Sequence, residues 1–175
     1  MTQHVLTAVL MAFPALVILG GVRDLVSYRI PNWISLALLG AFVPAALLAW
    51  VAGAPPSALG LHLAVGAAAL VAGVVMWTLR WIGGGDAKLF AAAALWLGLP
   101  AAGTYLAVTG LAGGALALAL LQLRSPLLRT YAMHGPEWVA RLAQPGENAP
   151  YGVAIAAGAL AAFPASPLLQ AAIGF

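Results

Sequence analysis

Two aspartates of this 175-residue chain stand at the edges of apolar stretches, where a pair of carboxylates could carry out acid–base chemistry. Asp24 follows the first apolar stretch, and Asp86 precedes a later one, behind three glycines in the sequence IGGGDAKL. Two acids hydrolyse a peptide bond when one, ionised, draws a proton from water and the other, protonated, donates to the carbonyl oxygen. Because two like charges held close together cannot both ionise, a shared site would hold the two carboxyls in different protonation states.

Each aspartate also has a purely structural interpretation. Asp86 before an apolar helix is a good N-cap, contributing about 1 kcal/mol. Asp24 could form an interfacial ion pair with Arg23 or Arg29, which contributes about 0–1 kcal/mol. Capping does not explain the glycine run, and an ion pair does not explain a second acid at matching depth. Spacing alone favours neither the two-carboxylate site nor the structural interpretations.

The composition is that of an integral membrane protein. The chain is 64% hydrophobic and 6% charged, against roughly 45–50% apolar and about 25% charged residues in ordinary soluble domains. At this length we expect a single domain, residues 1–175. The net charge of +3 is the balance of seven basic and four acidic residues. The basic residues are spread along the chain and form no patch for nucleic acid.

The sequence predicts neither a metal site nor a cofactor. It contains no cysteine, which excludes disulfides and thiolate ligands. His4, His62 and His134 are far apart and lack the spacing of metal ligands.

Six apolar stretches predict an all-α fold, a bundle of six transmembrane helices, because a helix needs about 20 apolar residues to cross the hydrocarbon. The segment from Lys88 to Leu123 is tight for two crossings and too long for one, and Pro100 with the small residues around it supplies the turn. The expected helices lie approximately at residues 4–22, 33–52, 60–79, 87–103, 104–122 and 151–173.

The basic residues predict the orientation of this bundle. With six crossings, every Lys and Arg falls on one face, which the positive-inside rule makes cytoplasmic. Both termini are then extracytoplasmic, and residues 123–150 form a cytoplasmic loop with a short interfacial helix at 136–143. Its acids, Glu137 and Glu147, are interpreted as solvated charges. A cleaved signal peptide at residues 4–22 is the less favoured alternative, because the positive charges follow this stretch rather than precede it.

Three motifs resemble one known family. The sequence GGGD at 83–86 resembles the GxGD signature of membrane-embedded aspartic proteases, and its extension GGGDAKL is similar to the form found in type IV prepilin peptidases. DLVSYRIPNW, which begins at Asp24, is similar to the family's first aspartate with its basic residue and Pro-Asn pair. PYGVAIAAG at 150–158 resembles the start of its last helix. The resemblance spans residues 24–158, with the motifs in the family's order.

The resemblance implies an aspartic endopeptidase with Asp24 and Asp86 as its catalytic residues. Its substrates would be pilin-like precursors with one apolar helix, cut at the cytoplasmic face of a bacterial inner membrane, with pilus assembly machinery as a further partner. The match is to the short form associated with Flp-type (tight adherence) pili. Since the first helix starts almost at Met1 and the chain lacks a cysteine cluster, N-methyltransferase activity is not expected. Expected substrate-binding residues are Gly83, Gly84, Gly85 and Lys88, and expected supporting residues are Arg29, Pro31, Asn32, Pro150, Tyr151 and Gly152.

The glycine run predicts open backbone near the reacting atoms. Without side chains, residues 83–85 leave N–H and C=O groups free to pair with an extended substrate. Asp86 at a helix N-terminus beside Lys88 is the expected base, and Asp24 near a helix C-terminus the expected acid. Arg23 and Arg29 act against this assignment of Asp24, and a coupled pair titrates as a unit.

Two other functions compete with the peptidase. A small ion-coupled transporter would use Asp24 and Asp86 as a proton relay and the glycine run as a broken helix. It predicts acids near the membrane midplane and two similar halves, whereas these acids lie at one rim and no repeat is visible. An inert assembly subunit leaves the motifs unexplained.

Overall fold

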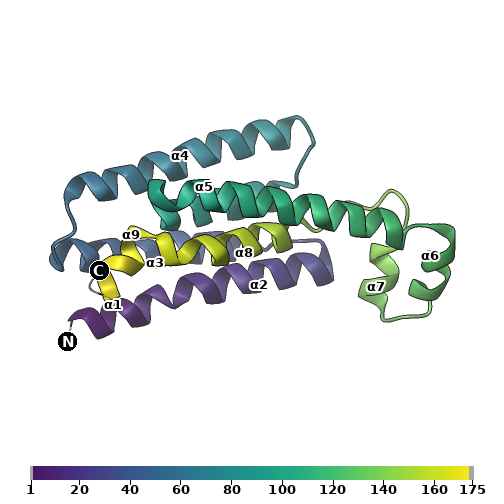
Figure 1. The fold of residues 1–175 in the computed structure, drawn as a ribbon, viewed down its shortest axis with the longest axis horizontal. Helices are drawn as coiled ribbons and strands as arrows, with labels where there is room; N and C mark the ends of the chain where they lie inside the picture. Colours follow the sequence, from purple (N-terminus) through teal and green to yellow (C-terminus); the bar gives the residue numbers. More distant parts are fainter. Residues whose placement is uncertain (1, 174–175) are drawn as a thin grey trace.

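The described part of the chain, residues 2–173 of a computed structural model, is helical throughout apart from its turns. This agrees with the predicted all-α class. The helices are α1 (Thr2–Leu10), α2 (Ala12–Ser27), α3 (Asn32–Val51), α4 (Pro56–Thr78), α5 (Gly84–Leu123), α6 (Pro126–Ala132), α7 (Glu137–Leu142), α8 (Tyr151–Ala162) and α9 (Pro167–Ile173), with a 3₁₀ turn η1 (Phe163–Ala165) between the last two (Figure 1).

Four of these segments are long and apolar enough to cross a membrane: His4–Ser27, Asn32–Val51, Pro56–Thr78 and Gly84–Leu123. The segment from α8 to α9, bent by 45°, makes a fifth if it counts as one span. By length and composition, the protein is therefore a membrane protein with four or five candidate spans. The predicted six crossings remain a prediction.

The long helix α5 is not straight. Gly98 has φ 68° and ψ −177°, outside the helical region. The Tyr105 hydroxyl donates to the Phe90 carbonyl over 3.2 Å, and the two rings lie 5.2 Å apart. In a straight helix, fifteen residues would separate them by about 22 Å, so the chain folds back at Gly98. The first arm covers residues 84–97 and the second arm covers residues 99–123.

The reversal lies at Gly98, two residues before Pro100, around which the sequence predicted the turn, and five residues before the approximate helix end predicted at residue 103. Pro100 has no N–H to donate to the Trp96 carbonyl, and glycine adopts positive φ at little cost. The carbonyls freed by the break find other partners. The Trp96 carbonyl accepts the Ser166 hydroxyl at 2.8 Å, and the Leu95 carbonyl pairs with Nδ1 of His62 at 2.8 Å. Each buried carbonyl is thus satisfied.

The first arm of α5 is the centre of the bundle. Its residues from Asp86 to Gly98 are buried except for Lys88, and α4, α8 and α3 pack around it. Trp96 is fully buried, and its indole N–H donates to the Leu38 carbonyl at 2.8 Å. A site carried by this arm is held by packing on several sides.

One end of the bundle carries the predicted cytoplasmic segments. The connection from α2 to α3, the connection from α4 to α5, and the segment with α6 and α7 lie together there, while α1 and α9 lie at the opposite end (Figure 1). The predicted loop 123–150 contains two short helices, and α7 coincides with the interfacial helix expected at 136–143.

Candidate active site

Asp24 is buried within α2. The predicted first helix ends at residue 22, but α2 continues to Ser27, so that Asp24 lies inside the last turn of the helix. The side chain is 5% exposed, and its Oδ2 accepts the Gly152 N–H at 2.7 Å. A Cβ on Gly152 would stand 2.8 Å from the Asp24 Cβ. The absence of a side chain at Gly152 is what allows α8 to approach this carboxylate.

Asp86 is the third residue of α5 and is also buried, with 8% of its surface exposed. Its Oδ2 accepts the Gly83 N–H at 3.0 Å, a hydrogen bond that satisfies a group at the start of the helix. Its Oδ1 is buried without a hydrogen-bond partner in the described structure. This oxygen therefore has an unused capacity to accept a hydrogen bond.

The structure brings the two aspartates together from positions 62 residues apart in the sequence. Their carboxylates are close enough to interact electrostatically, and the Gly152 N–H also interacts with Asp86. Two neighbouring cavities are each lined by both residues. The first, the dyad cavity, has a volume of about 470 Å³ and is lined by residues 24, 28–32 and 83–86.

The glycine run is only partly irregular, which corrects the expectation of open backbone at all three positions. Gly83 is extended, but Gly84 and Gly85 form the first turn of α5. A Cβ on Gly85 would lie 3.1 Å from the Ile30 Cβ, and one on Gly83 would lie 2.9 Å from Oδ2 of Asp86. These glycines admit the Asp86 carboxylate and the chain at Ile30. All three still line the dyad cavity.

The expected residues of the first motif lie around the dyad cavity. Arg29, Pro31 and Asn32 line it, and Arg29 is exposed. Lys88 does not line this cavity. Its ammonium donates instead to Oδ1 of Asn32 at 2.9 Å. The predicted influence of Lys88 on Asp86 is therefore replaced by a contact that joins the starts of α3 and α5.

A second cavity, the loop-side cavity, lies on the other side of the dyad. Its volume is about 380 Å³, and it adds residues from the end of α4 and the segment before α8. Tyr151 lines it, whereas Pro150 precedes α8 as its N-cap residue and lines neither cavity. Its lining is formed by Asp24, Tyr28, Trp77, Arg80, Trp81, Ile82, Gly83, Asp86, Asn148, Ala149 and Tyr151.

Tyr28 is a candidate site residue that the sequence did not single out. It ends α2 with a left-handed backbone, φ 54°, and lines both cavities. Its hydroxyl is buried without a partner in the described structure. Burial raises the pKa of this hydroxyl, while the positive charge of Arg124 acts in the opposite direction. The group is a neutral donor beside the dyad, and its only sequence signal was its place between Asp24 and the Pro-Asn pair.

Arg124 holds the segment before α8 against the bundle. From the end of α5 it donates to the carbonyls of Leu142 at 3.0 Å and Glu147 at 2.8 Å. The guanidinium of Arg141 lies 5.9 Å from the centre of the Tyr28 ring. We call residues 142–149 the strap, because Arg124 fixes them and Asn148 and Ala149 form a wall of the loop-side cavity.

Among the described residues, the hydrogen-bond partners of the two aspartates are backbone N–H groups. Oδ2 of Asp24 accepts the Gly152 N–H, and Oδ2 of Asp86 accepts the Gly83 N–H. The ion pair considered for Asp24 with Arg23 or Arg29 is not formed. Position at a helix N-terminus therefore does not distinguish Asp86 as the base, because an N–H at the N-terminus of α8 also donates to Asp24.

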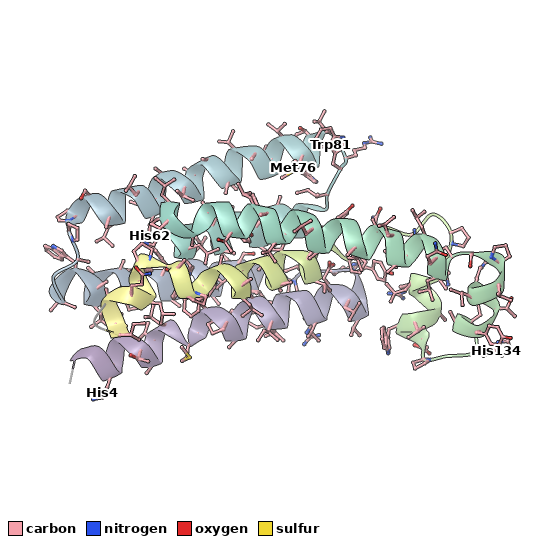
Figure 2. All side chains as sticks on the ribbon, viewed as in Figure 1. His4, His62, Met76, Trp81 and His134 are labelled. Carbon is pink, nitrogen blue, oxygen red and sulfur yellow. The ribbon has the colours of Figure 1, made fainter. Side chains whose placement is uncertain are left out.

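The remaining candidates do not join the site. Glu137 and Glu147 line neither cavity. Among the described residues, no three His, Cys, Asp or Glu side chains could hold a metal ion together. Figure 2 shows His4, His62 and His134 in separate parts of the fold.

Comparison with known proteins adds one finding. A family model described as the type IV leader peptidase family matches residues 11–118, more than half of the chain. The matched segment contains both aspartates. Neither a search of curated proteins nor a search of solved structures finds a match.

Proposed function

Because the chain belongs to the type IV leader peptidase family, and is therefore a membrane peptidase, we propose that it is an aspartic endopeptidase with Asp24 and Asp86 as its catalytic pair. The observation that carries this proposal is the meeting of two buried carboxylates, from α2 and α5, at the wall shared by two cavities. Two such groups with no other acid at hand are suited to peptide hydrolysis.

The proposed reaction consumes one water molecule. The ionised carboxylate takes a proton from the water while the water oxygen bonds to the carbonyl carbon of the substrate. The protonated carboxyl gives its proton to the carbonyl oxygen. The carbon–nitrogen bond then breaks as the nitrogen takes the proton that came from the water, and the re-forming carbonyl returns the other proton to the second carboxylate. This leaves a carboxyl group on the leader and an amine on the mature chain.

The surroundings supply what this reaction needs. Oδ1 of Asp86 has no protein partner in the described structure and can hold the attacking water. The N–H groups of the first turn of α5 lack intrahelical acceptors by geometry. They line the dyad cavity through Gly84 and Gly85, where they can pair with the substrate backbone. The hydroxyl of Tyr28 is a further donor on this wall.

The membrane arrangement is part of the same proposal. If each arm of α5 crosses, and α8 with α9 crosses once, the chain makes six crossings and both termini are extracytoplasmic. All seven Lys and Arg then lie on one face, the side of the dyad, which the positive-inside rule makes cytoplasmic. In a bacterium this places the protein in the inner membrane with its site at the cytoplasmic rim.

The proposed substrates are precursors of Flp-type pilins, each with a short leader on the cytoplasmic side and one apolar helix. The site is a crowded notch in which a small residue before the scissile bond suits the close approach of both carboxylates. Partners beyond the substrate are the lipid bilayer and the pilus assembly machinery. No N-methylation of the product is proposed.

A cleavage assay tests this function directly. The purified protein in lipid vesicles is mixed with a pilin-like precursor, and the products are identified by mass spectrometry. We expect one cut after a glycine at the leader boundary and no addition of about 14 mass units, the mass of one methylene group. A precursor that stays intact, or a methylated product, would contradict the proposal.

A further inference from the structure

An apolar groove opens beside the dyad cavity. It has a volume of about 450 Å³, and its floor is the first arm of α5, on which both α3 and α4 pack. Its rim includes Leu36 on α3 and Leu63 on α4, which are 64% and 59% exposed. We call it the lateral groove, because it lies between α3 and α4 on the side of the bundle.

The shape of the groove suits one helix. Its floor and one wall are small residues, Ala91 and Ala92 on α5 and Gly66 and Ala67 on α4, and small residues let helices approach closely in a membrane. On each helix the lining spans two turns, about 10 Å. Within lipid an incoming chain must satisfy its own backbone groups, so the occupant of an apolar groove is helical.

Ser35 gives a second, independent indication that something binds here. Its side chain lines the groove and is 6% exposed, yet its hydroxyl has no hydrogen-bond partner in the described structure. A buried hydroxyl without a partner costs free energy. An occupant helix with a polar atom at this level would satisfy it.

The groove adjoins the dyad cavity at Asn32. Asn32 lines both, and Lys88, which donates to Asn32 at 2.9 Å, lines the groove at the same end. A chain that leaves the groove at this end enters the dyad cavity next. The first N–H groups of any helix lack intrahelical acceptors. The amide oxygen of Asn32, which accepts the Lys88 ammonium, has a second lone pair that could accept one of them.

We propose that the lateral groove receives the first two turns of the precursor's apolar helix, and that the chain before this helix crosses Asn32 into the dyad cavity in extended form. This inference rests on the proposed peptidase function and adds the docking surface. The position of the groove beside the catalytic cavity favours the substrate as its occupant over a lipid chain or a second copy of the protein. The helix provides the register that sets which peptide bond meets the aspartates.

Photocrosslinking tests the groove. A photoreactive p-benzoylphenylalanine replaces Leu36 or Leu63 in an Asp86→Asn background, which is expected to keep the coexpressed pilin-like precursor uncleaved. Matched controls carry the label at Leu111 or Leu118 on the second arm of α5, which are 75% and 67% exposed. We expect crosslinks to the precursor helix from positions 36 and 63 and none from 111 and 118.

A steric experiment checks the same surface by rate. Ala67→Phe fills the groove and should lower cleavage of the full precursor at least about tenfold, a loss of about 1.4 kcal/mol, whereas Ala107→Phe, at an exposed position outside the groove, should not. Replacing a large residue by alanine in the first two turns of the precursor helix should restore part of the Ala67→Phe rate. A misfolded variant would show no such rescue, and failure of rescue counts against the proposal.

The outcomes separate this inference from the function on which it rests. If the wild-type protein cleaves the precursor but positions 36 and 63 crosslink only to lipid or to a second copy, the groove proposal is wrong and the peptidase stands. Equal crosslinking from all four positions has the same meaning. If the wild-type protein cleaves no precursor, the function itself fails.

Discussion

The backbone N–H of Gly152 donates a 2.7 Å hydrogen bond to Oδ2 of Asp24, across 128 positions of sequence. It joins the first turn of α8 to the last turn of α2, and the Gly152 N–H also interacts with Asp86. Gly21 supports the same approach, because a Cβ there would meet the Ala156 Cβ at 3.0 Å. The third motif of the sequence therefore contacts Asp24 through its backbone.

Gly152→Ala should lower peptidase activity by at least about tenfold, because the new Cβ would stand 2.8 Å from the Asp24 Cβ and one side must shift, and small misplacements of reacting groups are costly. The measurement is the rate of precursor cleavage in vesicles. Gly114→Ala is the control, since nothing lies within 4 Å of a Cβ there. Equal rates for the two variants would show that the contact does not position Asp24.

Gly98→Ala should destabilise the fold. Gly98 has φ +68°, and a Cβ there would stand 2.7 Å from Cε1 of His62. Backbone strain alone is expected to cost about 1–3 kcal/mol, and the clash with His62 adds to this cost. The thermal unfolding midpoint in detergent should fall. Gly110→Ala, whose Cβ would meet nothing within 4 Å, should leave it nearly unchanged. A common midpoint for both variants would contradict the reversal at Gly98.

Much of this architecture followed from the sequence, and the reversal shows where the prediction stopped. A turn between Lys88 and Leu123 was required by length, and Pro100 marked its neighbourhood. The position of the turn depends on partners that are distant in the chain, because His62 and Ser166 form hydrogen bonds with the freed carbonyls. Hydrophobicity alone carries no signal for such contacts.

In the candidate site, too, the sequence indicated the residues with a local signal and missed those that depend on contacts between distant segments. Asp24 and Asp86 were found because a charge at the edge of an apolar stretch is conspicuous. Tyr28 and Arg124 were missed, because a tyrosine or arginine near a membrane boundary is commonplace and their contacts span distant segments. The assignment of Asp86 as base and Asp24 as acid stays a prediction, and its helix-end argument did not foresee that the N-terminus of α8 faces Asp24.

Tyr28→Phe should lower the cleavage rate by about tenfold while the protein stays folded. The hydroxyl is buried, lines both cavities and has no partner in the described structure, so its loss removes a donor to the substrate and leaves no acceptor stranded. Tyr131→Phe is the control, because Tyr131 is 73% exposed on α6. If both variants keep the wild-type rate, Tyr28 has no part in the reaction.

Arg124→Ala should release the strap. The two shorter hydrogen bonds from Arg124 hold the carbonyls of Leu142 and Glu147, and an unheld loop samples open states more often. The chain has no cysteine, so a single Ala149→Cys, at a half-buried position in the wall of the loop-side cavity, reports access to that cavity. Labelling by a thiol reagent should be faster with Arg124→Ala than with Arg129→Ala, and equal labelling would mean that Arg124 does not hold this segment.

Under the proposed function the two carboxylates carry out the hydrolysis, and single amide replacements test this most directly. Asp24→Asn and Asp86→Asn keep the size of each side chain and an oxygen that can accept the N–H of Gly152 or Gly83, but remove the exchangeable acid. With membrane insertion and unfolding midpoint unchanged, each variant should lower the rate of precursor cleavage by at least about 100-fold. Glu137→Gln and Glu147→Gln should cleave at nearly the wild-type rate. A normal rate for either aspartate variant would show that the pair is not the catalytic site.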